Sequence, residues 1–431
     1  MPHRLDAREP GFEARFAAFL TGKRESQQDV NDAVAAIIAE VRKRGDGALV
    51  DYTQRFDRLA LRASDIRLTD ADIDAAAAEC SAGVREALQF AAQRIEAYHR
   101  KLLPADLDYL DVSGARLGAR WRPVASVGLY VPGGAAAYPS SVLMNAIPAR
   151  VAGVKRLAMV VPTPGGGLNP AVMAAARIAG IQEIHRVGGA QAIAALAYGT
   201  ETIAAVDKIV GPGNAYVAAA KRQVYGQVGI DMIAGPSEIL VLADGGNDPA
   251  WIAMDLLSQA EHDEAAQAIL ITDDRGFAER VEHAVEAELA RMPRAAIARA
   301  SWTTHGAVIL VGRLENALAL IDRIAPEHLE LAVADPEPLS QRIQNAGAIF
   351  LGRYAPEAVG DYVAGPNHVL PTARSARFSS GLGVHDFLKR TSLVRCDAES
   401  LARLGPAAVT LARAEGLEAH ARAIAIRLNL P

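Results

Sequence analysis

The sequence predicts an α/β protein with two Rossmann-like α/β domains, an N-terminal helical segment and a helical C-terminal tail. Short apolar runs of strand length alternate with helical stretches along most of the 431 residues, an order typical of parallel sheets. Several runs end in glycine loops, which often bind nucleotides at the carboxyl ends of such strands. No stretch reads G-x-G-x-x-G, so the dinucleotide fingerprint is absent, and a need for tight turns explains each loop about as well.

The composition narrows the possible partners and the compartment. With 51% hydrophobic and 22% charged residues the chain is an ordinary globular protein, and its net charge of -5 offers no basic excess for nucleic acid. No apolar run approaches the roughly 18 residues of a membrane span. The N-terminal MPHRLDAREPGFEARF has acidic residues and no apolar core, so it does not read as a secretory signal. We therefore expect a cytoplasmic protein without nucleic-acid or membrane partners.

The cysteine content limits the kind of metal site. Cys80 and Cys396 are the two cysteines of the chain. They are too few for a disulfide framework or a thiolate zinc site. Any metal must therefore be bound by histidine, carboxylate and amide groups.

The N-terminal half begins with helices and then changes to strands. Ala-rich, Leu-containing periodicity predicts helices at about 27–44 and 70–103, with a break near 45–47. A strand-like pattern covers 115–131 and ends in a glycine loop, and a helical stretch follows at 142–152. Three units then combine a strand, a glycine loop and a helix, with the strands at 156–161, 183–187 and 208–210.

A second α/β series begins at residue 238. Its strands are expected at 238–243, 266–272, 307–311, 329–333 and 348–351, with intervening helices from 248, at about 276–292, and ending near 324 and 345. The expected division is an N-terminal arm (1–25), a discontinuous first α/β domain (26–128 and 237–382), a second α/β domain (129–236) and a C-terminal tail (383–431). The tail is too short to form its own core, so it should dock on a larger body.

One predicted helix brings two possible metal ligands together. Asp248 followed by Pro249 reads as an N-cap with proline at the first helical position, so a helix should run to about Gln259 or one turn further. Gln259 and His262 then share a face, because residues three apart on a helix are neighbours. An imidazole beside an amide oxygen can bind a metal, although a helix end with a solvated histidine explains the same residues.

Further candidate residues lie in loops at the ends of apolar elements. Glu327 beside His328 offers a carboxylate and an imidazole of different pKa, as a general-base pair requires. A helix-to-strand corner with surface charges explains this pair as well. Asp361 stands among glycines, where turn residues are common, and His420 lies on an Ala-rich helix, where it could simply be solvated.

Eight motifs together resemble the histidinol dehydrogenase family, over residues from about 29 to 428. They are, in chain order, PVASVGLYVPGG, VGGAQAIAALAYGT, VDKIVGPGNAYV, IDMIAGPSEILV, DLLSQAEHD, APEHLEL, GDYVAGPNHVLPT and EGLEAHA. The resemblance implies the last steps of histidine biosynthesis, in which two successive NAD-dependent oxidations convert L-histidinol through L-histidinaldehyde to L-histidine. It also implies one zinc ion per subunit and a homodimer whose C-terminal segment crosses to the partner's active site.

The resemblance also implies roles for individual residues, and every position concerned is intact in this sequence. The implied bases are Glu327 and His328. The implied zinc ligands are Gln259, His262, Asp361 and His420, and the implied NAD contacts are Tyr130, Gln191 and Asn214. The implied substrate contacts are Ser237, Gln259, His262, His328, Asp361, His368, Glu415 and His420. Cys80 and Cys396 lie in none of the motifs, so neither receives a role.

The sequence departs from the family pattern in one loop, and two other functions remain possible. The chain has Ala373, Arg374 and Ser375 where the family often has a glycine, and Gly381 where it often has a proline, which bears on loop conformation. A paralogous dehydrogenase of another small alcohol, such as a sulfopropanediol, is one alternative, because a fold does not fix a substrate. A zinc-binding or storage protein without turnover is another. NADH formation from histidinol distinguishes an enzyme from a storage protein.

Overall fold

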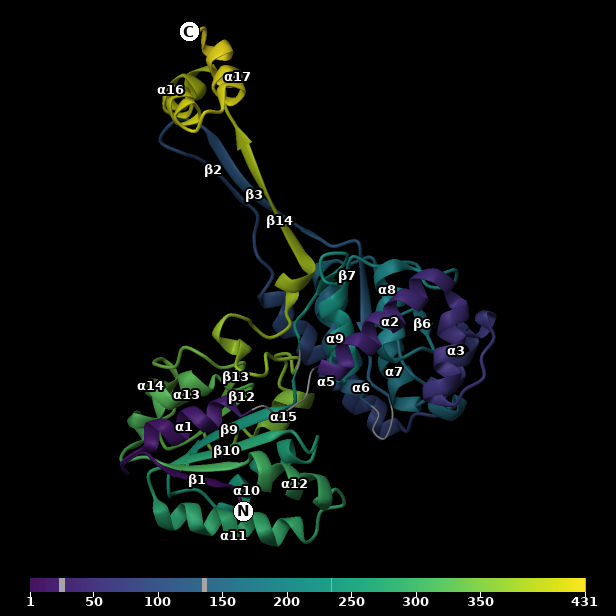
Figure 1. Ribbon diagram of the computed structural model, residues 1–431, viewed down its shortest axis with the longest axis vertical. Helices are drawn as coiled ribbons and strands as arrows, with labels where there is room; N and C mark the ends of the chain where they lie inside the picture. Colours follow the sequence, from purple (N-terminus) through teal and green to yellow (C-terminus); the bar gives the residue numbers. More distant parts are fainter. Residues whose placement is uncertain (23–27, 134–137, 234, 431) are drawn as a thin grey trace.

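The chain folds into two parallel β-sheets, each with helices on both faces, and an arm that projects away from them (Figure 1). The computed structural model describes residues 1–22, 28–133, 138–233 and 235–430. The two sheets and their alternating helices confirm the predicted α/β class. Within these residues, no helix is both long and apolar enough to cross a membrane.

The six-stranded sheet has the order β1-β11-β10-β9-β12-β13, and all of its strand pairs are parallel. Because both faces are covered, the central strand β9 is buried at every position. Helices α10, α11 and α12 pack on one face, and α1 and α13 pack on the other. The strands are β1 (His3–Asp6), β9 (Glu238–Ala243), β10 (Gln267–Thr272), β11 (Ala307–Leu310), β12 (His328–Ala332) and β13 (Ala348–Leu351). The helices are α1 (Phe12–Thr21), α10 (Pro249–Ala260), α11 (Arg275–Leu289), α12 (Ala295–His305), η3 (Leu314–Ala317), α13 (Leu318–Ile324), α14 (Glu337–Ser340) and α15 (Glu357–Tyr362).

The five-stranded sheet has the order β6-β5-β4-β7-β8 and is also parallel. One face carries α4, α5, α6 and α7, and the other carries α2, α3, α8 and α9. In β5, Leu157 and Met159 point to the first face and Ala158 and Val160 to the second, as the two-residue period of a strand requires. The strands are β4 (Ser126–Tyr130), β5 (Arg156–Val160), β6 (Glu183–His185), β7 (Lys208–Val210) and β8 (Gly229–Ile230). The helices are α2 (Gln28–Arg44), α3 (Asp46–Asp57), η1 (Ala63–Asp65), α4 (Asp70–Ala78), α5 (Ala82–Lys101), α6 (Pro139–Ala152), η2 (Pro164–Gly166), α7 (Pro170–Ile178), α8 (Gly189–Tyr198) and α9 (Ala215–Val224).

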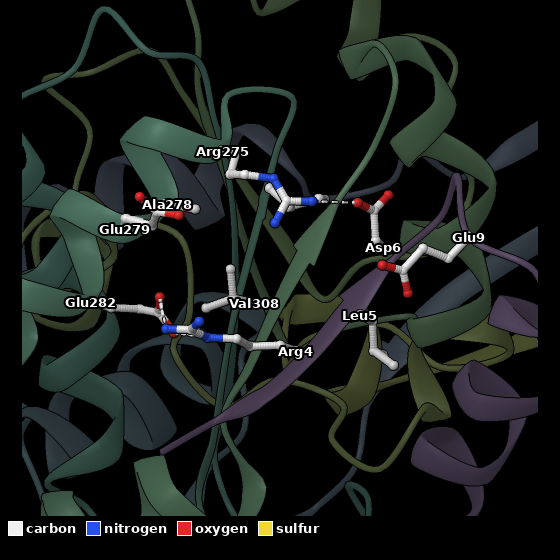
Figure 2. Close-up of a pocket in the computed structure, with 10 residues that line it drawn as sticks. Arg4, Leu5, Asp6, Glu9, Arg275, Ala278, Glu279, Glu282 and Val308 are labelled. Carbon is white, nitrogen blue, oxygen red and sulfur yellow. Dashed lines mark hydrogen bonds and ion pairs between the residues drawn. The ribbon is translucent and has the colours of Figure 1, made fainter.

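The N-terminal residues belong to the six-stranded sheet and do not form the separate arm expected for 1–25, of which 23–25 lie outside the described residues. Strand β1 pairs in parallel with β11 at the edge of the sheet. Figure 2 shows how ion pairs fix this edge: Arg4 donates to both carboxylate oxygens of Glu282 on α11, and Arg275 donates to Asp6. A strand of four residues carries too little pattern to be recognised in the sequence, so its neighbour in the sheet decides its conformation.

The helices α2 to α5 pack on the five-stranded sheet, although residues 26–128 are expected to share a domain with 237–382. Helix α2 shares a core with α8 through Val34 and Ile193, and α5 shares another core with α6. An amphipathic helix carries no mark of which sheet it covers, because both sheets offer apolar faces. The sequence therefore predicts these helices but not their place.

Several element boundaries also differ from the prediction. The expected break at 45–47 is Gly45 alone, whose φ of 54° separates α2 from α3. The helix expected at 70–103 is interrupted between α4 and α5, and the strand expected at 115–131 is divided into β3 and β4, which belong to different sheets. The helix expected to end near 345 is the single turn α14.

The arm combines a three-stranded antiparallel sheet, of order β14-β3-β2, with two terminal helices (Figure 1). The two helices pack on each other around Val409, Ala421 and Ala425. The tail therefore ends in helices as expected, but these follow the strand β14, whose side chains are almost all exposed, so no apolar alternation indicates that strand in the sequence. The elements of the arm are β2 (Leu107–Leu110), β3 (Arg116–Pro123), β14 (Leu388–Arg395), α16 (Ala398–Ala414) and α17 (Glu418–Leu428). Two short turns precede β14 outside the arm: η4 (Ser375–Arg377), and η5 (Val384–Phe387), which packs in a core of the five-stranded sheet.

A buried ion pair fixes the loop that follows β7. Lys221 of α9 and Asp231, which follows β8, contact each other and are almost fully buried. Lys221 Nζ donates to the Gly211 carbonyl at 3.0 Å, and the Gly211 N–H donates to Asp231 Oδ2 at 2.8 Å. Gly211 has a φ of 118°, and a Cβ there would lie 2.1 Å from the carbonyl oxygen of Tyr130. The ion pair therefore binds both the N–H and the carbonyl of Gly211, a position that only glycine can occupy.

Removing one member of this pair should destabilise the protein strongly. Lys221→Met leaves the Asp231 carboxylate buried without its cation, an effect of about 3–5 kcal/mol for buried pairs. Lys221→Met with Asp231→Leu leaves no unpaired charge and should restore much of the loss. The thermal unfolding midpoint of each variant is the measurement. The matched control is Arg299→Met, which removes the half-exposed ion pair with Glu286 and should lower the unfolding midpoint far less. Equal unfolding midpoints for Arg299→Met and Lys221→Met would contradict this expectation.

Candidate functional site

A cavity of about 330 Å³ lies where the two sheets face each other. Its walls come from loops that follow β4 and β7 at the carboxyl edge of the five-stranded sheet, and from residues at the starts of β9 and β12, at the amino edge of the six-stranded sheet. Among the lining residues are Pro132, Tyr138, Ser141, Pro212, Gly213, Asn214, Ser237, Gln259, His262, Glu327, His328, Asp361 and His368. Residues from both sheets therefore meet in one space.

Helix α10 begins as predicted and delivers two candidate metal ligands to the cavity. Asp248 accepts a hydrogen bond from the Ala250 N–H at 2.8 Å, with Pro249 at the first helical position. Gln259 Oε1 is buried and has no hydrogen-bond partner in the described part of the chain. His262 follows the helix end, and its N–H donates to the Gln259 carbonyl at 3.2 Å, so both side chains line the cavity. His262 is exposed, yet the protein around its ring desolvates it and lowers its pKa.

Glu327 and His328 stand at the start of β12, where the backbone of β9 holds both. The Glu238 N–H donates to Glu327 Oε2 at 2.9 Å, and His328 Nδ1 lies 3.0 Å from the Glu238 carbonyl oxygen. Because a carbonyl can only accept, Nδ1 must carry the proton, which leaves Nε2 as the acceptor of a neutral ring. His328 Nε2 lies 3.7 Å from Asp361 Oδ1 and has no hydrogen-bond partner among the described residues. When the ring is neutral, Nε2 can therefore accept a proton inside the cavity.

Burial and neighbouring charges shift the pKa values of this pair. Burial raises the pKa of Glu327 to about 8, although His328 and the Glu238 N–H favour its charged form. Burial by itself lowers the pKa of His328, but the carboxylates of Glu327 and Asp361 outweigh it and hold that pKa above the ordinary histidine value. Glu327 Oε2 and His328 Nδ1 are 3.7 Å apart, so the two groups titrate as a coupled pair.

Asp361 lies in the last turn of α15 among three imidazoles. Burial would raise its pKa, but the His328 ring 3.7 Å away and the charges of His368 and His262 lower it to about 2. His368 Nδ1 donates to the Asp361 carbonyl at 2.9 Å, and its Nε2 accepts from the Ser141 hydroxyl at 3.3 Å. Asp361 is thus an anion at the cavity wall, and His368 lines the cavity with both ring nitrogens engaged.

Glu357 is a site residue that the sequence reasoning missed. Ligand atoms of Glu357, His328 and Asp361 all lie within 4.8 Å of one another, close enough to hold a metal ion. The Ser258 hydroxyl donates to Glu357 Oε2 at 2.9 Å, and burial raises the pKa of this carboxyl to about 7. Glu357 and Asp361 are four residues apart, a spacing that places them on one helix face. This four-residue spacing indicates a shared face only if residues 357–362 are helical, which the sequence alone did not predict.

The three candidate NAD contacts lie at the carboxyl edge of the five-stranded sheet. Asn214 caps α9 by accepting from the Val217 N–H at 3.2 Å, and it lines the cavity. Tyr130 ends β4 and is buried, and its hydroxyl accepts from the Gly189 N–H at 3.1 Å. Gln191 is buried in the first turn of α8. Tyr130 and Gln191 therefore lie beside the cavity wall and not in it.

Two predicted site residues are far from the cavity in this chain. Glu415 and His420 are exposed on the arm, at the junction of α16 and α17, which Figure 1 shows projecting away from both sheets. Neither is among the cavity-lining residues. The structure thus brings together three of the four predicted zinc ligands, Gln259, His262 and Asp361, and leaves His420 apart.

The loop that departs from the family pattern keeps a glycine-like backbone. Ala373 and Arg374 both have positive φ, at 50° and 64°, a region that side chains other than glycine rarely adopt. Hydrogen bonds hold the strained loop: the Ala373 N–H donates to Glu238 Oε1 at 3.0 Å, and the Gly235 N–H donates to the Thr372 hydroxyl at 2.5 Å. The departures therefore leave this wall of the cavity in place.

Comparison with known proteins gives one consistent answer. The family model described as histidinol dehydrogenase matches residues 20–428. The curated histidinol dehydrogenase of Rhodospirillum rubrum is 66% identical over 430 residues, which cover 100% of this chain and 99% of that protein, and that of Rhizobium meliloti is 64% identical with the same coverage. The crystal structure of histidinol dehydrogenase from Elizabethkingia anophelis superposes with a TM-score of 0.95 at 36% identity, covering 99% of this chain and 98% of that one. The chain belongs to the histidinol dehydrogenase family of NAD-dependent oxidoreductases.

Proposed function

We propose that the chain oxidises L-histidinol through L-histidinaldehyde to L-histidine, with two NAD molecules in succession and one zinc ion per subunit. The observation that carries the proposal is the pairing of Glu327 and His328, which face Asp361 within the same cavity as Gln259 and His262. The family and the names of the relatives support histidinol as the substrate and do not favour a sulfopropanediol or a storage role. A cytoplasmic location is proposed from the sequence alone.

The zinc ion would be held by Gln259, His262 and Asp361, with His420 as a fourth ligand. The donor set suits zinc, because imidazole, carboxylate and amide oxygen are ligands that this ion accepts and no thiolate is needed. Gln259 Oε1 supports this assignment, since a buried carbonyl oxygen without a donor among the described residues is unfavourable unless a ligand satisfies it. When bound, the ion would supply a Lewis-acidic charge that holds the nitrogen atoms of histidinol.

His328 would act as the base of the first oxidation. As hydride leaves the carbinol carbon for NAD, the hydroxyl proton passes to Nε2, the ring nitrogen that faces the cavity. The Glu238 carbonyl fixes the tautomer that makes this nitrogen the acceptor. In this step the carbinol becomes the aldehyde and NAD is reduced.

Glu327 would act in the second oxidation. It removes a proton from water as the water oxygen adds to the aldehyde carbon, and the hydrate then gives its hydride to a second NAD to form the carboxylate. Its raised pKa of about 8 suits a group that takes up and releases protons near neutral pH. The Glu238 N–H keeps the carboxylate at the cavity wall throughout.

We further propose a homodimer in which the arm of each chain completes the site of the other. Glu415 and His420 lie too far along the arm to reach the cavity of their own chain as it is folded here (Figure 1). The arm also exposes Leu411 (65%) and Ile426 (70%), apolar side chains that a partner chain would bury. A tail docked on its own chain is the alternative arrangement.

Replacing Glu327 should uncouple the two oxidations. Wild-type protein should form about two NADH per histidinol, because the same site activates water for the second step. Glu327→Gln should move the yield toward about one and let the aldehyde accumulate, since the amide cannot take a proton from water. NADH absorbance and trapping of the aldehyde measure both effects.

The pH dependence gives an independent check of the same role. A base must be unprotonated, so aldehyde oxidation should rise as the pH passes upward through about 8, and Glu327→Gln should lack that rise. Glu315→Gln, on an exposed side chain, is the control and should keep both the yield and the rise. An undiminished NADH yield in Glu327→Gln would rule out this role.

Removing the metal should abolish turnover and leave the fold largely intact. The proposed ligands are not thiolates, and each sheet has apolar cores that do not involve the cavity. Activity and circular dichroism after chelation, and again after zinc is restored, are the measurements. Gln259→Leu should reduce zinc content without unfolding the protein. Global unfolding on chelation would instead make the ion structural.

A mixed dimer should reveal whether the sites are shared. A Glu327→Gln chain paired with a His420→Asn chain has one site without lesions if the arms cross, and one lesion in each site if they do not. The two chains would carry different affinity tags, and the mixed dimer would be isolated through both. Because Glu327→Gln is expected to block only the second oxidation, the readout is histidine formation, which should be substantial in the mixed dimer and small in either parent. A dead mixed dimer would show that each arm serves its own chain.

A further inference from the structure

The end of α3 lies against the proposed nucleotide edge of the five-stranded sheet. A Cβ on Gly166, in the loop that follows β5, would meet the Leu59 side chain at 3.3 Å. Two residues earlier, Asp57 ends α3 close enough to the Tyr130 hydroxyl for its charge to help raise the pKa of that hydroxyl. Tyr130 in turn accepts from the N–H of Gly189 at the start of α8. A carboxylate from a distant segment is thus brought beside the strand ends.

Asp57 is placed where a carboxylate is unfavourable. Its Oδ2 atom is buried and has no hydrogen-bond partner in the described ranges, and this burial raises its pKa. It also ends a helix, where the partial negative charge of the last carbonyl groups repels an anion. Arg186, which borders the same loop, donates to Thr163 and Gly166 and is not paired with Asp57. Stability of the fold therefore does not explain a carboxylate at residue 57.

A second acceptor without a donor lies beside the same helix start. Gln191 is 1% exposed, and its Oε1 lacks a partner among the residues that the structure describes. This oxygen points at the start of α8, because a Cβ on Gly189 would lie 2.7 Å from it. Two oxygens that can only accept therefore require a ligand that donates. Vicinal hydroxyl groups meet this requirement, and a phosphate does not.

We propose that Asp57 binds the ribose hydroxyls of the dinucleotide and excludes a 2′-phosphate, which makes it the residue that selects NAD over NADP. Carboxylates do this in other α/β nucleotide sites, although there they follow a strand of the same sheet. The adenosine ribose is the one concerned, because Asn214 lines the cavity that holds Glu327 and His328, whereas Asp57 and Gln191 do not line it. The inference rests on the proposed function and on Tyr130 and Gln191 being NAD contacts, as the family resemblance implies.

A structural water is the competing explanation. The Thr53 hydroxyl, one turn before Asp57 on α3, is also buried without a partner among the described residues. A water between the two would satisfy both groups. In that case Asp57 would affect stability and would treat NADH and NADPH alike.

The test is equilibrium binding of NADH and NADPH to the full-length, zinc-loaded protein by calorimetry. Wild type should bind NADH more tightly than NADPH. Asp57→Asn should shift the ratio of the two dissociation constants toward NADPH by about ten- to a hundredfold, the size of a lost charge-assisted hydrogen bond together with a lost repulsion. Asp57→Glu keeps the charge, so it should still reject NADPH even if NADH binds less well. The ratio of kcat/KM for the two cofactors should follow the binding ratio.

The matched control is Asp51→Asn on the same helix, whose carboxylate is exposed and pairs with Arg44. It should leave the ratio unchanged. Asp57→Asn with an unchanged ratio, whatever its stability, overturns the role of Asp57 and favours the structural water. If the wild-type protein binds NADH and oxidises histidinol, an unchanged ratio in Asp57→Asn still leaves the proposed function standing. A wild type that binds neither dinucleotide overturns both.

Discussion

The backbone of Glu238 is the constraint on which the candidate site depends. Its N–H donates to Glu327, its carbonyl accepts from His328, and its side chain accepts from the Ala373 N–H. This is possible because β9 and β12 are parallel neighbours with His328 opposite Ile239. A shift of one residue in that register would move the Glu238 N–H and carbonyl out of reach of Glu327 and His328. The geometry of the bases is therefore a consequence of sheet register and not of the local loop.

The charges around His328 prepare the cavity for a cation. Asp361 and Glu357 lie within 4.8 Å of the ring, and the Glu357 N–H donates to the buried Glu330 carboxylate at 2.5 Å. Burial and the neighbouring Asp255 raise the pKa of Glu330 well above its ordinary value. Buried carboxyl groups at this density are unfavourable as anions unless protons or a positive charge compensate them. The proposed zinc ion would bring that charge.

Local signals in the sequence predicted local structure well. The cap at Asp248 fixed the start of α10 and hence the position of Gln259, and the apolar runs located the strands of both sheets apart from β1 and the two-residue β8. Long-range packing was not predictable in the same way. The helices between residues 28 and 101 have apolar faces that suit either sheet, and β14 has an exposed pattern that only its pairing with β3 explains. Glu357 was missed because its spacing from Asp361 matters only on a helix.

The candidate site is divided among parts of the chain that can act separately. Under the proposed roles, the nucleotide binds at the carboxyl edge of the five-stranded sheet, and the substrate binds at the amino edge of the six-stranded sheet. The Lys221–Asp231 pair stiffens the nucleotide side through Gly211, and Glu238 stiffens the substrate side. Because each side is held by its own contacts, a reduced nucleotide could leave without loosening the groups that hold the aldehyde. A reaction that needs two successive hydride acceptors and one retained intermediate requires such independence, and two rigid edges facing each other across one cavity provide it.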